Sequence, residues 1–101
     1  MKYFLYRLPM SHPAKFIGHD FASEHGMLPD RNDYVTVYAG EIEEEDENKA
    51  LNKIWEIFNN AYPEGYRLAS LSVSDVIGLW AGSKEINYWY VDSIGFKQIW
   101  N

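Results

Sequence analysis

The stretch YVTVYAGEIEEEDENKALNKIWEIFNNA, residues 34–61, decides the fold because it joins a strand pattern directly to a helix pattern. Residues Tyr34 to Ala39 are β-branched or aromatic apart from the last, and their alternation predicts a strand. The same alternation places Tyr34 and Tyr38 on one face of that strand. Gly40 is expected to end it.

A long amphipathic helix is predicted to follow, with Asp46 as its N-cap and Glu47 or Asn48 as its first residue. Its apolar residues recur with a period close to that of an α-helix, which is typical of a helix with one buried face. Pro63 and Gly65 end the pattern. The predicted buried stripe consists of Ala50, Leu51, Ile54, Trp55, Ile57, Phe58 and Ala61.

Shorter elements flank this pair. An aromatic-rich strand is predicted over Lys2 to Leu8 and a short helix over Ala14 to His25, where Gly26 is placed as a C-terminal cap. The prediction is therefore one domain, residues 1–101, of the α+β class: one mainly antiparallel sheet packed against one long and one shorter helix. The final third supplies three strands and a hairpin turn: Leu71 to Ile77, Ile86 to Val91, Phe96 to Trp100 and, as the turn, Ala81 to Lys84.

Composition places the chain among globular proteins and removes several kinds of chemistry. The 101 residues are 47% hydrophobic and 24% charged, which suits one domain with its own core. Because there is no cysteine, disulfides, zinc–thiolate sites and cysteine nucleophiles are excluded. The net charge of −6 argues against direct nucleic acid binding. No apolar run is long enough to span a membrane and no signal-peptide core is present, so we expect a cytoplasmic protein that does not bind membranes.

An acidic run precedes the long helix: six of the seven residues from Glu41 to Glu47 are acidic. Carboxylates in the first turn of a helix are stabilised by its dipole, so the run is first interpreted as a helix N-terminus. The alternatives are a partner-binding patch, a surface that mimics the phosphates of DNA, and a metal site. A calcium loop is disfavoured because the D-x-[DN]-x-[DN]-G spacing is missing. The candidate partner-binding carboxylates are Glu43, Glu44, Glu45 and Glu47.

The sequence presents no recognisable catalytic constellation, so we assign no catalytic, cofactor-binding or metal-ligating residue. Among His12, His19 and His25, the last two are six residues apart and would point to nearly opposite sides of a helix, unlike a metal-binding i,i+4 pair. No serine lies in a G-x-S-x-G elbow and no glycine-rich phosphate loop occurs. We expect a protein that is not an enzyme and needs no cofactor. A small hydrolase or metal enzyme, in which His19 or His25 meets carboxylates, is the third functional alternative.

Aromatic residues make up 17% of the chain, more than one small core usually accommodates. Alternation puts Tyr88 and Tyr90 on one face of their predicted strand and Trp89 and Val91 on the other. One face therefore looks away from the core unless another segment covers it. Tyrosine anchors protein interfaces because it offers apolar area together with a polar group. Tyr88 and Tyr90 are therefore predicted to bind a partner; a homodimer interface is the alternative use of this face.

Two motifs, LSVSDVI at residues 71–77 and YVDSIGF at residues 90–96, resemble the YodL-like domain family, together with YAGEI at residues 38–42 and the helix through Phe58 and Asn59. The resemblance extends over residues 34–100. Such domains occur in Gram-positive bacteria and in plasmids, phages and conjugative elements. The resemblance therefore implies a setting in mobile genetic elements, and it implies no catalytic mechanism. From the residues alone, polar side chains of both motifs are expected to bond nearby backbone, with a tight turn at the glycine: Ser72, Ser74, Asp75, Asp92, Ser93 and Gly95.

The preferred functional hypothesis is a non-enzymatic protein-binding module of mobile-element type that engages and inhibits a host protein, for example a defence nuclease. Small acidic proteins from mobile elements commonly bind and inhibit host proteins, so this expectation rests on analogy. The first alternative is an acidic DNA mimic of the anti-restriction or anti-CRISPR kind. That alternative predicts strong salt dependence and competition with duplex DNA.

Overall fold

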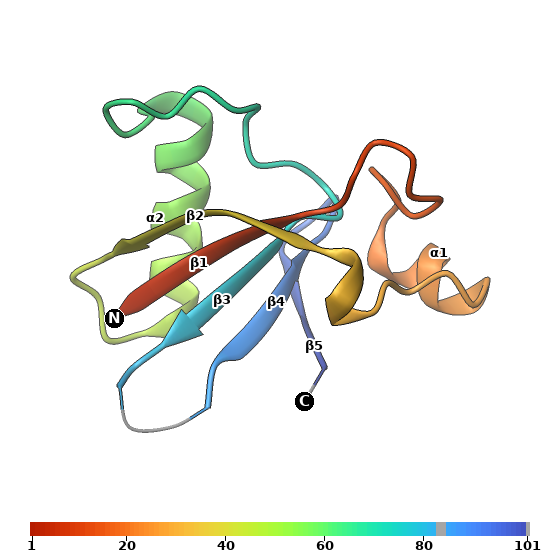
Figure 1. Ribbon diagram of the computed structural model, residues 1–101. Helices are drawn as coiled ribbons and strands as arrows, with labels where there is room; N and C mark the ends of the chain where they lie inside the picture. Colours follow the sequence, from red (N-terminus) through yellow and green to blue (C-terminus); the bar gives the residue numbers. More distant parts are fainter. Residues whose placement is uncertain (83–84, 101) are drawn as a thin grey trace.

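A computed structural model describes residues 1–82 and 85–100 and shows an α+β domain built on a five-stranded sheet (Figure 1). The strands lie in the order β2-β1-β3-β4-β5, and each neighbouring pair is antiparallel. The predicted class and the antiparallel sheet are confirmed. The elements in chain order are β1 (Lys2–Arg7), α1 (His19–Glu24), the 3-10 helix η1 (Arg31–Asp33), β2 (Val35–Glu41), α2 (Glu47–Asn60), β3 (Val76–Trp80), β4 (Asn87–Val91) and β5 (Phe96–Ile99).

Helix α2 begins where the sequence predicts. Asp46 precedes it in an extended conformation, and its carboxylate accepts a hydrogen bond from the backbone N–H of Lys49 at 3.1 Å. The interpretation of the acidic run as a helix N-terminus is thereby confirmed for Asp46 and Glu47, whereas Glu41 lies in β2 and residues 43–45 precede the helix. The first helical residue, Glu47, also contacts the sheet, because its carboxylate accepts hydrogen bonds from Asn87 Nδ2 at 3.0 Å and Trp89 Nε1 at 3.4 Å. These bonds fix the start of α2 against β4.

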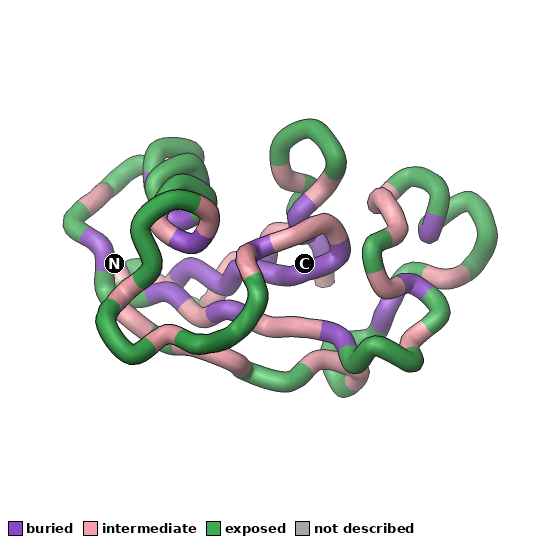
Figure 2. Tube along the Cα trace, turned by 90° about the horizontal axis from the view of Figure 1, so that it is seen from above, coloured by how far each residue is buried: buried purple, intermediate pink, exposed green. Residues whose placement is uncertain are grey.

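The α2 side of the sheet holds the larger core, and buried residues follow the strands beneath the helix (Figure 2). Tyr3 and Leu5 of β1 point to this side. The prediction that Trp55 and Ala61 also belong to the core is wrong: Trp55 is 39% exposed, and Ala61 is exposed just after the helix ends. One residue along a helix is a rotation of about 100°, so Trp55 lies at the flank of the stripe that faces the sheet. The buried helix residues are Ala50, Leu51, Ile54 and Phe58.

The opposite face of the sheet is covered by the N-terminal segment between β1 and β2. Tyr90 Oη donates a hydrogen bond to the carbonyl of Ile17 at 2.6 Å, and Trp100 Nε1 donates one to the carbonyl of Pro29 at 3.1 Å. Tyr88 is 6% exposed and Tyr90 is fully buried. The expectation that these two tyrosines form an exposed contact face is therefore wrong. The segment that covers them has no strand of its own, so periodicity could not reveal it.

A β-bulge divides β2. Leu5 pairs with Tyr38 but Tyr6 pairs with Thr36, which leaves Val37 as the extra residue. A bulge of one residue reverses the alternation beyond it. Tyr38 therefore packs on the α2 core, whereas Tyr34 packs on the core of the opposite face. The prediction that these two tyrosines share a face is wrong for this reason.

Gly40, which was expected to end its strand, lies inside β2, and a second glycine, Gly78, lies inside β3. Gly40 pairs with Tyr3, and a Cβ atom at Gly40 would lie 2.7 Å from the Tyr3 hydroxyl. Gly78 lies within β3, where a Cβ atom would be 3.1 Å from the ring of Tyr6 and 3.0 Å from Ile86. In both places a glycine allows a neighbouring side chain to lie across the strand. The sequence pattern shows the glycine but not the ring above it.

The remaining boundaries differ from the predicted ones by more than one residue in two places. The predicted helix over Ala14 to His25 is shortened to α1, because Gly18 is extended and Phe16 has a φ of +66°. Gly26, with a φ of +65°, closes the end of the helix as predicted, and its N–H donates a hydrogen bond to the Ser23 carbonyl at 3.3 Å. The strand predicted from Leu71 begins only at β3, because residues 72–75 form a turn closed by a bond from Asp75 N to the Ser72 carbonyl at 3.0 Å. Two residues of the predicted hairpin turn, 83 and 84, lie outside the described residues. Within the described ranges, no helix is both long and apolar enough to cross a bilayer.

Candidate functional site

The acidic run does not form one uniform surface. Asp46 and Glu47 hold the start of α2, and Glu44 lies 3.8 Å from the ammonium of Lys53 in an ion pair. Glu43 and Glu45 are exposed. The run thus combines structural carboxylates with free ones, and the partner-binding role of Glu43, Glu44, Glu45 and Glu47 stays a prediction.

The three histidines lie apart, each with its own neighbour. His12 Nδ1 accepts a hydrogen bond from Ala14 N at 3.0 Å. In the neutral ring the proton is therefore on Nε2, which donates a hydrogen bond to Asp33 Oδ2 at 3.2 Å. His19 Nδ1 is 3.1 Å from Asp20, and His25 Nδ1 is 2.8 Å from the Phe21 carbonyl. In the part of the chain that the structure describes, no three His, Asp or Glu side chains are grouped to hold a metal ion.

Asp75, directly before β3, is a buried charged residue that several hydrogen-bond donors surround. Its buried carboxylate accepts hydrogen bonds from the Arg7 guanidinium on both oxygens. Nη2 of Arg7 lies 3.0 Å from Oδ2, and Nε lies 3.2 Å from Oδ1. It also accepts the backbone N–H of Ser72 at 2.9 Å, which confirms the local bonding expected of this motif. The carbonyl of Asp75 accepts Val91 N at 2.8 Å. One residue thus joins the ends of β1 and β4 to the start of β3.

A second cation, Lys15, approaches the same carboxylate. Its Nζ lies 4.0 Å from Asp75 Oδ1 and donates a hydrogen bond to the carbonyl of Leu8 at 3.0 Å. Burial lowers the pKa of Lys15; Asp75 opposes this shift and Arg7 adds to it. For Arg7, burial is outweighed by the hydrogen bonds and charge of Asp75, which raise its pKa. One carboxylate faces two cations, so the cluster has surplus positive charge.

The loop that carries Lys15 has a strained backbone. Phe16 has a φ of +66°, a region that aromatic residues rarely adopt. Its N–H donates to Oγ of the buried Ser74 at 3.0 Å, and Tyr34 Oη donates to the carbonyl of Ser74 at 2.7 Å. Such strain persists only where surrounding contacts hold it, and it is concentrated at functional sites. Here those contacts hold the left-handed backbone at Phe16, whose ring is exposed.

An apolar groove of about 410 Å³ opens beside this cluster. The nearly buried Arg7 and Lys15 line its deeper part. Four of the nine large hydrophobic side chains that are exposed in the described residues lie along its walls. These four, with their exposed fractions, are Met10 (75%), Phe16 (53%), Val35 (61%) and Leu68 (51%).

Sequence reasoning missed this groove. Its four wall residues lie in three separate segments, and each one alone is an ordinary exposed hydrophobic residue. One signal was available: Asp75 lies in a mostly apolar motif, and a buried carboxylate requires a cation. The sequence does not say that Arg7 and Lys15 supply it, because both lie more than fifty residues away in the chain.

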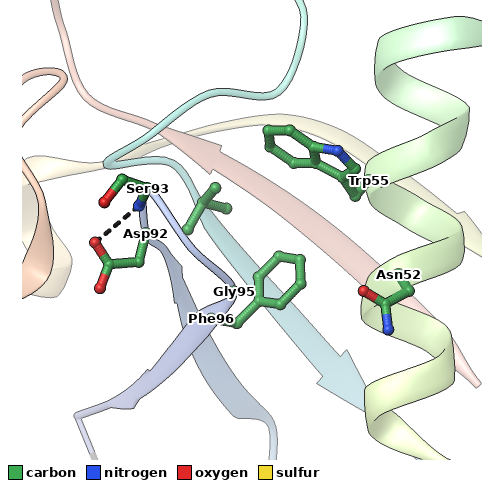
Figure 3. A pocket seen from close by; sticks show the side chains of 7 residues that line it. Asn52, Trp55, Asp92, Ser93, Gly95 and Phe96 are labelled. Carbon is green, nitrogen blue, oxygen red and sulfur yellow. Dashed lines mark hydrogen bonds between the residues drawn. The ribbon is translucent and has the colours of Figure 1, made fainter.

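A second cavity, of about 220 Å³, lies between α2 and the β4–β5 turn (Figure 3). The side chains of Trp55, Phe96 and Asn52 face it, while the Asp92 carboxylate turns away. That carboxylate accepts Ser93 N at 2.8 Å and His19 N at 3.3 Å, so it serves the turn and the start of α1. Gly95, with a φ of +75°, completes the expected tight turn. The Asp92 carboxylate is thus taken up by the turn, and Asn52 is a polar side chain that faces this cavity.

Comparison with known proteins gives one result. A family model described as the YodL-like domain matches residues 3–101, nearly the whole chain. The match includes the N-terminal segment, which the sequence motifs alone did not cover. Neither a curated protein nor a solved structure matches the chain.

Proposed function

The chain belongs to the YodL-like domain family, and we propose that it is a protein-binding module whose partner docks in the apolar groove beside Arg7 and Lys15. The observation that carries this proposal is the gathering of Met10, Phe16 and Leu68 with Val35 around one groove. Monomeric proteins rarely leave apolar side chains contiguous at the surface unless they serve a contact. A groove that also contains buried charge offers the mixture of apolar and polar groups typical of interfaces.

The wider proposal concerns the partner. The family resemblance supports a mobile genetic element as the setting. Analogy with small acidic proteins of such elements supports a host protein as the partner and inhibition as the outcome of binding, and the proposed location is the cytoplasm. On this view the domain acts by binding and not by catalysis. The exposed Glu43 and Glu45 lie at the far end of β2 from the groove and assist association by attraction at a distance.

Capture from a lysate of a Gram-positive host tests the proposal when the wild-type chain is compared with surface variants. The groove variant carries Met10→Asp and Leu68→Asp, both at exposed positions. The matched control is Ile94→Asp, at a side chain that is 90% exposed in the β4–β5 turn. Circular dichroism and thermal unfolding verify that both variants fold.

The expected result is a protein that is retained by the wild-type chain and by Ile94→Asp but lost by the groove variant. Retention through a wash at about 0.5 M salt, where surface charge pairs are largely screened, would indicate apolar anchoring. The proposal fails if the groove variant retains the same protein as the wild type. It also fails if the wild type retains none, or retains one only at low salt that duplex DNA displaces, which is the behaviour of a DNA mimic.

A further inference from the structure

Strand β2 is an edge of the sheet, and part of its backbone faces outward. Met1 and Ile42 exchange both backbone hydrogen bonds, at 2.7 and 2.9 Å, so they form a hydrogen-bonded pair. Such pairs alternate with non-hydrogen-bonded ones along antiparallel strands. Lys2 with Glu41 and Phe4 with Ala39 are therefore non-hydrogen-bonded pairs. The N–H and C=O groups of Glu41 and Ala39 point to the outer edge, where no described strand pairs with them.

The edge and the groove are continuous. Val35 is the first residue of β2 and also lines the groove, as does Val37 at the bulge. A segment added to this edge would place alternate side chains on the α2 side of the sheet, where the groove opens. Unpaired edge strands bind extended peptides through backbone bonds, and neighbouring pockets select the side chains. The groove has the place and the apolar character of such a pocket.

Charge changes sign along β2. At its end lie the exposed Glu41, Glu43 and Glu45. At its start the nearly buried Arg7 and Lys15 line the groove with Asp75 between them. The neighbouring charges of opposite sign are Asp33, which is bonded to His12 just before β2, and Lys2, which pairs with Glu41. A ligand that follows this edge therefore meets exposed carboxylates at one end and, inside the groove at the other, two cations that share one carboxylate. Complementary charge fixes the direction of a bound segment as well as its encounter rate.

We infer that β2 and the groove take an extended peptide segment of the partner, paired antiparallel to β2 as every neighbouring pair in this sheet is. Its N-terminal half carries basic side chains beside Glu41 and Glu43. Its C-terminal half carries apolar side chains in the groove and an acidic side chain directed to Lys15. This inference rests on the proposed function, because it names the part of the partner that the groove would hold.

A phage-displayed library of random peptides, slightly longer than β2, tests the inference with the full chain as bait. In the expected enriched sequences, apolar residues stand at every second position. Lys or Arg precedes this apolar stretch, and Asp or Glu follows it. A synthetic peptide of an enriched sequence is then compared with one in which its basic and acidic residues are exchanged. The exchanged peptide is expected to bind about tenfold more weakly or worse, because each end would meet like charge.

The backbone pairing has its own test in Ala39→Pro. Proline at this position removes an outward N–H and leaves the bonds to β1 in place, since proline is tolerated at an edge. We expect about a tenfold loss of peptide affinity, because the hydrogen bond from the N–H of residue 39 to the peptide is lost and the proline ring occupies its place. Ala39→Thr keeps the N–H and is the matched control, with affinity close to that of the wild type.

The outcomes separate this inference from the proposed function. If no peptide is enriched, if the exchanged peptide binds equally well, or if Ala39→Pro and Ala39→Thr bind alike, the inference is overturned. The proposed function still stands in those cases if whole-protein capture depends on Met10 and Leu68. If capture fails as well, both are wrong.

Discussion

At the scale of single residues, Asp75 is the residue whose removal should cost the most stability, because its buried carboxylate lies between Arg7 and Lys15 in one cluster. Removing one partner of a buried ion pair is costly since the remaining charge is left without compensation. The same carboxylate holds the turn at Ser72. Ion pairs at the surface behave differently, because water screens both partners.

Asp75→Ala is expected to lower the free energy of unfolding by about 3–5 kcal/mol, the range for a buried pair that loses one partner. Urea denaturation measures this change, as a shift in the midpoint of the unfolding transition. Glu44→Gln, which breaks the exposed pair with Lys53, is the control and should cost less than about 1 kcal/mol. Equal losses in the two variants would show that the cluster does not stabilise the fold.

Buried tyrosines set the response to high pH. Burial, with the charges of Asp92 and Asp75, raises the pKa of Tyr90 from 10.0 to about 12. Since the folded-state pKa lies above the unfolded one, the stabilisation is complete below pH 10 and is lost as the pH rises towards 12. Unfolding free energy should therefore fall over this range, and Tyr90→Phe should reduce the slope. An unchanged slope in that variant would exclude Tyr90 as a source.

At the scale of elements, sequence reasoning succeeded where local rules decide the structure. Helix α2 was predicted because Asp46 and the apolar stripe act within the element itself. The short helix and the entry to β3 were misjudged, since left-handed residues at Phe16 and Ser74 are held by partners far away in the chain. The prediction that Tyr90 is exposed was wrong for the same reason: a loop that is distant in the chain covers this side chain.

The N-cap gives an element-scale prediction. Asp46→Ala should lower the free energy of unfolding by about 0.5–2 kcal/mol, because the N–H of Lys49 loses its acceptor. Asp46→Asn keeps a capping oxygen and should remain close to the wild type. Thermal unfolding of the three proteins measures this. A loss in Asp46→Asn as large as in Asp46→Ala would mean that charge, not capping, stabilises the start of α2.

At the scale of the whole molecule, the sheet separates an α2 core from a core closed by the N-terminal segment, and the groove opens on the α2 side at the start of β2. Pattern and composition predicted the fold class because alternation and helical periodicity are local. They did not predict the groove, whose walls come from the loops after β1 and α2 and from β2. Such a surface exists only once the chain has folded.

The central claim is that the outer edge of β2 and the groove form the binding surface. Amide hydrogen exchange of the chain, alone and bound to the captured partner, tests it most directly. We predict new protection at the outward N–H groups of Ala39 and Glu41 and in the loop around Phe16. Protection confined to residues 43–47 or to the β4–β5 turn, with the β2 edge unchanged, would contradict the claim.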